Sequence, residues 1–133
     1  MQTAQSENKK SILIVEDDES LQRALADKFM REGFETHTAL TGKSGLESAL
    51  ANHPDIILLD IVMPEMDGPT MLEKLRQEGE WGKKARVIFL TNLSQTSDKM
   101  LEQIMRDEPV FYLVKSNMLL SGVVARVNES LLT

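Results

Sequence analysis

Short apolar runs alternate along this chain with longer segments in which apolar residues recur at every third or fourth position. The run from Ser11 to Val15 is continuous and rich in β-branched residues, which is typical of a strand covered on both faces. Leu21, Leu25 and Phe29 then recur every fourth residue and form one stripe of a helix. Gly33 follows as a common helix stop. The chain therefore opens with a strand followed by an amphipathic helix.

The same alternation continues over the rest of the chain. We expect further strands at residues 34–39, 55–59, 86–90 and 110–114. Helical stripes follow them, carried by Leu46, Ala49 and Leu50, by Met71, Leu72 and Leu75, by Met100, Leu101, Ile104 and Met105, and by Leu120, Val123, Val124, Val127 and Leu131. Thr41 is the expected cap of the second helix, and Trp81 is expected to anchor a loop. Five strands alternating with five helices predict an α/β, doubly wound, mostly parallel sheet with right-handed crossovers and helices on both faces.

The size and composition fit one such domain. The chain has 133 residues, 41% of them hydrophobic and 27% charged, which is ordinary for a soluble globular protein. Its net charge of 15 − 21 = −6 argues against direct contact with nucleic acid or an anionic membrane. It has no cysteine, which excludes disulfides and thiolate sites and fits the reducing cytoplasm. No apolar run approaches the roughly 20 residues of a membrane span.

The two ends of the chain differ in character. Residues 1–10 are polar and lack the apolar core of a secretory signal, so we expect a mobile leader. Residues 11–132 contain the alternating segments, with no repeat, low-complexity tract or internal linker. We therefore expect a single domain over residues 11–132.

Chemically active side chains follow four of the five expected strands. The first strand ends in the acidic run 16–18 (Glu-Asp-Asp), and the third ends in Asp60. The fourth ends in Thr91 and the fifth in Lys115. In open parallel sheets, ligands bind beyond the carboxyl ends of the strands. We therefore expect carboxylates, a hydroxyl and one ammonium group to gather at one rim, while the second strand supplies nothing comparable.

The chemistry open to these groups is narrow. Crowded carboxylates repel one another unless a proton or a cation neutralises them. Ligation by oxygen alone favours Mg²⁺, which also binds phosphate oxygens. A carboxylate such as Asp60 can act as a nucleophile toward phosphorus and form an aspartyl phosphate. Lys115 offers a point charge, and Thr91 a hydrogen-bond donor, for phosphoryl oxygens.

Each of these residues also has a structural interpretation when taken alone. The run 16–18 is acidic, as a helix N-terminus prefers, and Asp60 precedes a loop rich in proline and glycine. Thr91 suits a helix cap, and Lys115 by itself is an ordinary surface lysine. Their joint placement at the ends of strands favours the functional interpretation.

Four parts of the sequence together resemble the chemotaxis-regulator-like receiver domain of two-component response regulators. They are residues 12–18 (ILIVEDD), residues 58–68 (LLDIVMPEMDG), Thr91, and residues 112–115 (YLVK). The resemblance covers roughly residues 10–132. It implies a flavodoxin-like receiver fold with sheet order 2-1-3-4-5. It also implies a phosphorelay signalling domain that is not an enzyme, although it assists its own phosphorylation and dephosphorylation.

The resemblance assigns a role to each site residue. Asp60 becomes the phosphoacceptor and, with Asp17, a ligand of Mg²⁺. The backbone carbonyl of Val62 completes the protein's share of the metal site, and Glu16 acts through a metal-bound water. Lys115 contacts the phosphoryl group.

The resemblance also implies a route for the signal. Thr91 and Tyr112 form the coupled switch pair, the hydroxyl moving toward the phosphate while the ring turns inward. The donor is a phosphohistidine on a sensor histidine kinase or a histidine phosphotransfer protein. The fourth helix, fifth strand and fifth helix form the expected surface for a homodimer or a downstream partner.

Three positions depart from the family's usual pattern. Ser116 stands where proline usually follows the lysine, and a cis peptide bond before a non-proline residue costs about 3 kcal/mol. Asn92 stands where a small residue usually follows Thr91, and Val62 is apolar at a position that is often polar.

Other functions fit the sequence less well. Phosphatases with an aspartate nucleophile carry a second Asp two residues later, where this chain has Val62. No glycine-rich loop follows the first strand, which disfavours nucleotide binding. The remaining alternative is a degenerate receiver that acts as a phosphorylation-independent interaction module.

Overall fold

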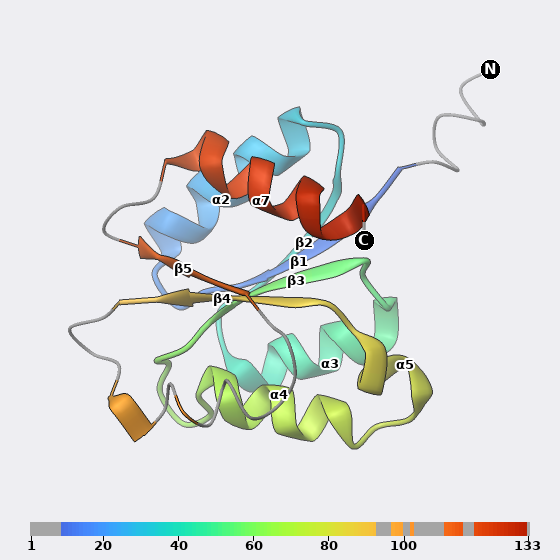
Figure 1. The fold of residues 1–133 in the computed structure, drawn as a ribbon, viewed down its shortest axis with the longest axis vertical. Helices are drawn as coiled ribbons and strands as arrows, with labels where there is room; N and C mark the ends of the chain where they lie inside the picture. Colours follow the sequence, from blue (N-terminus) through green and yellow to red (C-terminus); the bar gives the residue numbers. More distant parts are fainter. Residues whose placement is uncertain (1–8, 93–96, 100–101, 103–110, 116–118, 133) are drawn as a thin grey trace.

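A computed structural model describes residues 9–92, 97–99, 102, 111–115 and 119–132. Within them a central sheet lies between two layers of helices (Figure 1). The strands are β1 (Ser11–Val15), β2 (Glu35–Ala39), β3 (Ile56–Asp60), β4 (Val87–Thr91) and β5 (Phe111–Val114). All neighbouring pairs are parallel, and the order is β2-β1-β3-β4-β5. The expected doubly wound fold and its strand order are therefore confirmed.

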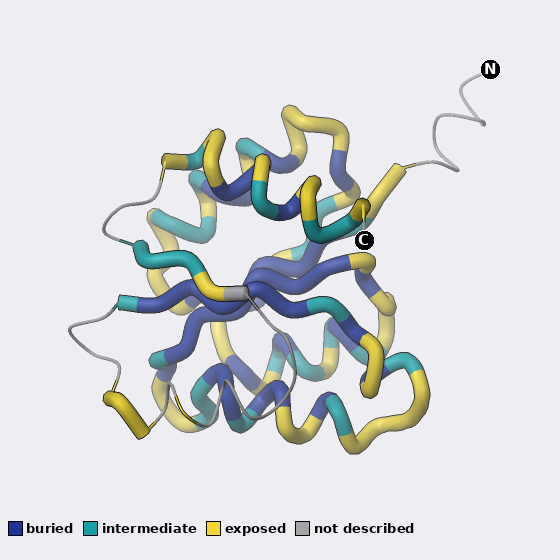
Figure 2. Tube along the Cα trace, in the orientation of Figure 1, coloured by how far each residue is buried: buried dark blue, intermediate teal, exposed yellow. Residues whose placement is uncertain are grey.

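The two faces of the sheet bury separate sets of side chains, because successive residues of a strand point to opposite faces. In β1, Ile12 and Ile14 belong to the core beneath α2 (Glu19–Arg31) and α7 (Leu120–Leu132). Leu13 and Val15 belong to the core on the side of α3 (Gly42–Asn52) and α4 (Gly68–Arg76). Figure 2 shows the strands at the centre of the molecule as almost wholly buried. Burial on both faces explains the continuous apolar runs.

Side-chain caps fix where three helices begin. The Asp18 carboxylate accepts hydrogen bonds from the first turn of α2, and Asp67 accepts one from Thr70 at the start of α4. Thr41 caps α3 together with Ser44, as the sequence predicted for Thr41. Such caps satisfy amide groups that have no partner inside the helix.

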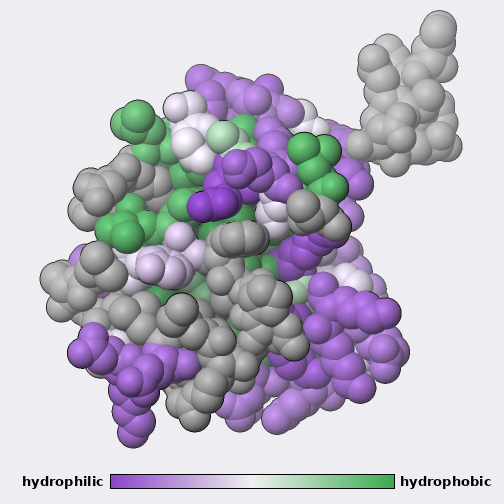
Figure 3. All heavy atoms as spheres, in the orientation of Figure 1, coloured by the Kyte–Doolittle hydropathy of each residue, from purple (hydrophilic) through white to green (hydrophobic). Residues whose placement is uncertain are grey.

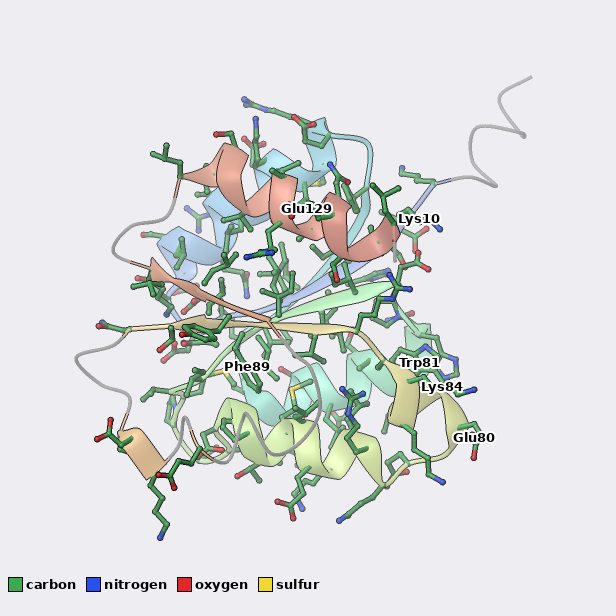
Figure 4. All side chains as sticks on the ribbon, in the orientation of Figure 1. Lys10, Glu80, Trp81, Lys84, Phe89 and Glu129 are labelled. Atoms are coloured by element: carbon green, nitrogen blue, oxygen red, sulfur yellow. The ribbon has the colours of Figure 1, made fainter. Side chains whose placement is uncertain are left out.

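A short helix, α5 (Glu80–Lys84), replaces the loop that we expected around Trp81. The guanidinium of Arg76 donates to the carbonyls of Gly82 and Ala85 at 2.9 and 2.7 Å, which holds this helix against the end of α4. Trp81 stacks on His53 with ring centroids 4.3 Å apart. Figure 4 shows Trp81 on α5, near the end of the sheet where β4 begins. This end lies opposite the strand ends discussed below.

Several of the features expected from the sequence involve residues outside the ranges that the structure describes. The helix expected around residues 100–105 is described only at Asp98, Lys99 and Glu102, which are helical. Most of the leader and the peptide bond between Lys115 and Ser116 also lie outside. Among the described residues, no helix combines the length and apolarity that a bilayer crossing requires.

Candidate functional site

The carboxyl ends of β1, β3, β4 and β5 meet at one rim of the sheet. There Glu16 follows β1, Asp60 ends β3, Thr91 ends β4 and Lys115 follows β5. An open pocket of about 500 Å³ lies at this rim. It is lined by Glu16, Asp17, Asp18, Asp60, Val62, Met63, Pro64, Asn92 and Lys115. The parallel sheet thus gathers side chains that lie up to 99 positions apart (115 − 16 = 99).

Lys115 joins the two buried carboxylates of the site. Its Nζ lies 2.9 Å from Glu16 Oε1 and 3.1 Å from Asp60 Oδ1. Glu16 is fully buried and Asp60 is only 2% exposed. Two carboxylates therefore share one ammonium group in a place where water screens their repulsion poorly.

The unfavourable electrostatic environment has a large effect on the pKa of Asp60. Burial, the nearby charge of Glu16 and a hydrogen bond with Asp17 together raise the pKa of Asp60 from 3.8 to about 8, although Lys115 acts in the opposite direction. In the metal-free protein near neutral pH, Asp60 therefore holds a proton in a large fraction of molecules.

Lys115 stays charged across the same range. Burial alone would lower its pKa, but the carboxylates of Glu16 and Asp60 outweigh this effect and raise the pKa above its ordinary value of 10.5. The site therefore contains one permanent positive charge. This charge can stabilise an anionic group that becomes bound to Asp60.

The acidic run after β1 divides between two tasks. Asp18 caps α2, its Oδ1 accepting from the amides of Ser20 and Leu21 at 3.0 and 3.1 Å. Glu16 Oε2 accepts from the Asp18 amide at 3.0 Å, which fixes the turn between them. Asp17 is exposed and lines the pocket. The capping interpretation is correct for Asp18, and Asp17 is left facing the site.

A cation would find an oxygen-rich set of ligands here. Glu16, Asp17 and Asp60 each place a carboxylate oxygen within 4.8 Å of the others. The set contains no nitrogen or sulfur donor, and its charge exceeds what Lys115 alone neutralises. Both properties fit a hard divalent cation such as Mg²⁺.

The loop from β3 to α4 forms one wall of the pocket through Val62, Met63 and Pro64. The Gly68 amide donates to the Ile61 carbonyl at 2.8 Å and closes the loop on itself. Glu65 adopts a positive φ of 68°, which is strained for a residue with a side chain. The hydrogen bond from Gly68 to Ile61 thus closes the loop directly after Asp60.

The expected switch residues, Thr91 and Tyr112, are not among the residues that line the pocket. Thr91 is fully buried at the end of β4, and its neighbour Asn92 is the residue of this segment that lines the pocket. Tyr112 lies on the edge strand β5, and 47% of it is exposed. In this structure the Tyr112 ring is thus turned toward solvent.

Some neighbours of the site could not be assigned from the sequence. Met63 and Pro64 line the pocket, and the amide of Gln22 donates to the carbonyl of Glu16 at 3.2 Å. Met63 and Pro64 carry no group whose chemistry points to a site. Gln22 lies on a helix that also carries other polar residues, so only its contacts distinguish it.

Comparison with known proteins points to one family. A family model described as "Response regulator receiver domain" matches residues 12–121, which is most of the chain. The matched segment contains every residue that the sequence analysis placed in the site.

Two curated relatives match parts of the chain. "Regulatory protein AtoC" of Escherichia coli (strain K12) is 46% identical over 65 residues, covering 49% of this chain and 14% of that protein. "Response regulator ArlR" of Staphylococcus aureus (strain Mu50) is 35% identical over 89 residues, covering 67% of this chain and 39% of that protein. The matched segments thus span less than half the length of either relative.

A solved structure shows the same fold. The response regulator receiver domain protein (CheY-like) from Methanospirillum hungatei JF-1 superposes with a TM-score of 0.83 at 24% identity. The match covers 92% of this chain and 94% of that one.

The raised pKa of Asp60 predicts a pH-dependent stability in the metal-free protein. Between about pH 4 and pH 8 the folded chain keeps a proton that the unfolded chain releases, so folding is favoured at the acid end and this contribution is lost as pH rises through the folded pKa. Asp60→Asn removes the titration. Its free energy of unfolding should exceed that of the parent by at least about 1 kcal/mol at pH 8, with the difference shrinking toward pH 4.

Urea unfolding in the presence of a chelator, repeated from pH 4 to pH 8.5, measures this difference. Asp27→Asn is the matched control, because Asp27 lies in an exposed ion pair with Arg31. A difference for Asp60→Asn that stays constant over the whole range would contradict the assignment.

Proposed function

The chain belongs to the response regulator receiver domain family, and we propose that it accepts a phosphoryl group on Asp60 and signals by changing conformation. The observation that carries this proposal is the placement of Asp60. It lies buried at the base of an open pocket, with Lys115 at 3.1 Å and two further carboxylates beside it. In two-component signalling such a domain is a signalling module, and the family relationship supports the cytoplasm as its compartment.

The proposed reaction is transfer from a phosphohistidine. A carboxylate oxygen of Asp60 attacks phosphorus and forms an O–P bond while the P–N bond of the donor breaks. The histidine nitrogen keeps the electron pair of the broken bond and takes a proton from water. Asp60 must be ionised to attack, so its proton has to leave before transfer. The donor is a sensor histidine kinase or a histidine phosphotransfer protein.

We assign the cation site to Asp17, Asp60 and the backbone carbonyl of Val62, with Glu16 acting through a water molecule. When bound, Mg²⁺ neutralises charge on the carboxylates and on the phosphoryl oxygens. Asp17 and Asp18 both line the pocket, and the Asp18 carboxylate is already engaged in capping α2. Glu16 is already held by Lys115 and by the Asp18 amide, which favours an indirect role.

Lys115 supplies the second positive charge. Its Nζ contacts Asp60 directly, so a phosphoryl group on Asp60 would arrive within its reach. A charged amine donating to a phosphoryl oxygen makes a strong, short hydrogen bond. Lys115 then stabilises the product as well as the transfer.

The signal leaves the site, we propose, through Thr91 and Tyr112. Both lie on the two strands farthest along the sheet from β2, and Phe89 of β4 pairs with Tyr112 of β5. A hydrogen bond from Thr91 to the phosphoryl group would draw its segment inward and make room for the exposed Tyr112 ring. The two states then differ in their contacts, as a population shift requires.

The surface that responds would be the face of β5 and α7 with the helix expected before β5. Figure 3 shows separate apolar patches over α7 and near β5, with hydrophilic residues between them. Tyr112 and Leu119 are 47% and 75% exposed there. Exposed apolar area beside an edge strand supports a homodimer or a downstream protein as the partner.

Incubation with acetyl phosphate and Mg²⁺ should add one phosphoryl group to Asp60, because the donor's phosphorus meets a carboxylate beside a cation and Lys115. The product should be stable in acid and labile in base, as an acyl phosphate is. Intact mass and site mapping measure the uptake. Unchanged uptake in Asp60→Asn would refute the assignment, and no uptake in the parent would favour the phosphorylation-independent interaction module.

Asp17→Asn should weaken Mg²⁺ binding by about tenfold or more, because it removes one charged ligand. Calorimetric titration measures the affinity. Asp18→Asn is a matched control one residue away, since asparagine caps a helix as well as aspartate does. Equal affinities in the parent and Asp17→Asn, or an equal loss in both variants, would remove Asp17 from the site.

Binding of Mg²⁺ and beryllofluoride, a phosphoryl mimic, should shift amide resonances of β5 and α7 more than any others beyond the site. The comparison is between heteronuclear NMR spectra of the free and the bound protein. Shifts confined to α2 and β2, with β5 and α7 unaffected, would refute the proposed route.

A further inference from the structure

The β2 strand contributes no side chain to the pocket, yet its carboxyl end contacts both loops that form the site. We call residues 39–42, from the last residue of β2 to the first of α3, the β2–α3 corner. One contact runs to the acidic turn after β1, and the other runs to the loop after β3. The first contact is a set of hydrogen bonds and the second is a close approach of two backbone segments. Neither contact involves an ionisable side chain of the corner.

The first contact passes through Gln22 on α2. The side-chain nitrogen Nε2 of Gln22 donates to the backbone carbonyl of Ala39 at 2.9 Å and to that of Glu16 at 3.2 Å. The Glu16 amide also donates to the Ala39 carbonyl, at 3.1 Å. Gln22 is half-buried and Ala39 is buried, so water competes weakly for these groups. The backbone of Glu16 is therefore fixed on both sides, and Asp17 follows it directly.

The second contact is a close approach of backbone at Gly42. A methyl group added there would lie 2.6 Å from the Met66 carbonyl oxygen and 3.0 Å from the Met66 Cβ. Only glycine therefore lets the first turn of α3 lie against the loop of residues 61–67. This loop carries Val62 and Pro64, which line the pocket. The β2–α3 corner therefore packs directly against the backbone of this loop.

Together these contacts fix two walls of the pocket relative to each other. Asp17 and Val62 both line the pocket, one following β1 and the other following β3. Metal affinity depends on groups that orient the ligands as well as on the ligands themselves. We propose that the β2–α3 corner, through Gln22 and Gly42, positions Asp17 and Val62 for the cation. This inference rests on the proposed function.

The first test compares two glycine-to-alanine substitutions that each bring a methyl group against a backbone carbonyl oxygen, in different places. Gly42→Ala pushes the loop, whereas a methyl group at Gly82 in α5 would meet the Leu75 carbonyl oxygen at 2.1 Å, far from the site. Gly122→Ala, where nothing lies within 4 Å of the added methyl, controls for alanine in a helix. Urea unfolding measures stability, and calorimetry measures Mg²⁺ affinity.

Gly42→Ala should lower Mg²⁺ affinity by about tenfold. Gly82→Ala should keep its affinity within about twofold of the parent, whatever it loses in stability. A purely structural role for Gly42 predicts that both variants lose stability and keep their affinity. That result, or an equal loss of affinity in both, would overturn the proposal.

The second test uses Gln22, in case Gly42→Ala fails to fold. Gln22→Leu keeps the size of the side chain but donates no hydrogen bond, while Gln22→Lys retains a donor of similar reach. Mg²⁺ affinity should fall in the leucine variant and recover at least in part in the lysine variant. Equal affinity in the parent and Gln22→Leu would overturn the role of Gln22.

A readout without metal separates this inference from the proposed function. In NMR spectra of the metal-free protein, Gly42→Ala should shift the amides of residues 61–67, and Gln22→Leu should shift those of residues 16–18. If the parent protein failed to bind Mg²⁺, the proposed function would be wrong. The chemical-shift changes in the metal-free variants would still test whether the β2–α3 corner positions the two loops. Unshifted amides in folded variants would defeat the corner alone.

Discussion

The ion pairs of Lys115 with Glu16 and Asp60 are the interaction on which the site depends. One ammonium group lies 2.9 and 3.1 Å from two carboxylates that are almost wholly buried, and Asp17 adds a third nearby. Buried charges of this kind are tolerated only when they are paired. Because the carboxylates outnumber the ammonium group, the metal-free site is left short of positive charge. That deficit makes it receptive to a cation.

The parallel sheet makes this arrangement possible. Continuous apolar runs bury β1, β3 and β4 on both faces, and the parallel pairing of these strands brings their carboxyl ends to one rim. The same burial surrounds Asp60 with protein and raises its pKa. Stability and function therefore oppose each other at this position. The core that holds the strands together also makes the site unfavourable until its charge is balanced.

The sequence predicted the strands and the gathering of Glu16, Asp17, Asp60 and Lys115 at one rim, because both depend on strong local signals. Apolar runs identify buried strands, and polar side chains directly after them identify the rim. Where the sequence pattern was weaker, it predicted the wrong local structure or predicted no role for a residue. Glycines around Trp81 indicated a loop, but Arg76 holds that segment as a helix through contacts that no local pattern reveals. Asp18 caps α2 through local hydrogen bonds, but the acidic run alone does not show which of its members does so. The supporting roles proposed for Gln22 and Gly42 depend on tertiary contacts.

In the proposed mechanism, the Lys115 ammonium group is held by Glu16 and Asp60 until a phosphoryl group on Asp60 takes up its charge. A high-resolution structure of the protein with Mg²⁺ and beryllofluoride tests this most directly. It should show beryllium bonded to a carboxylate oxygen of Asp60, with Lys115 Nζ moved from Glu16 to a fluorine atom. Beryllofluoride bound elsewhere, or Lys115 still 2.9 Å from Glu16 Oε1 as in the free protein, would contradict the account.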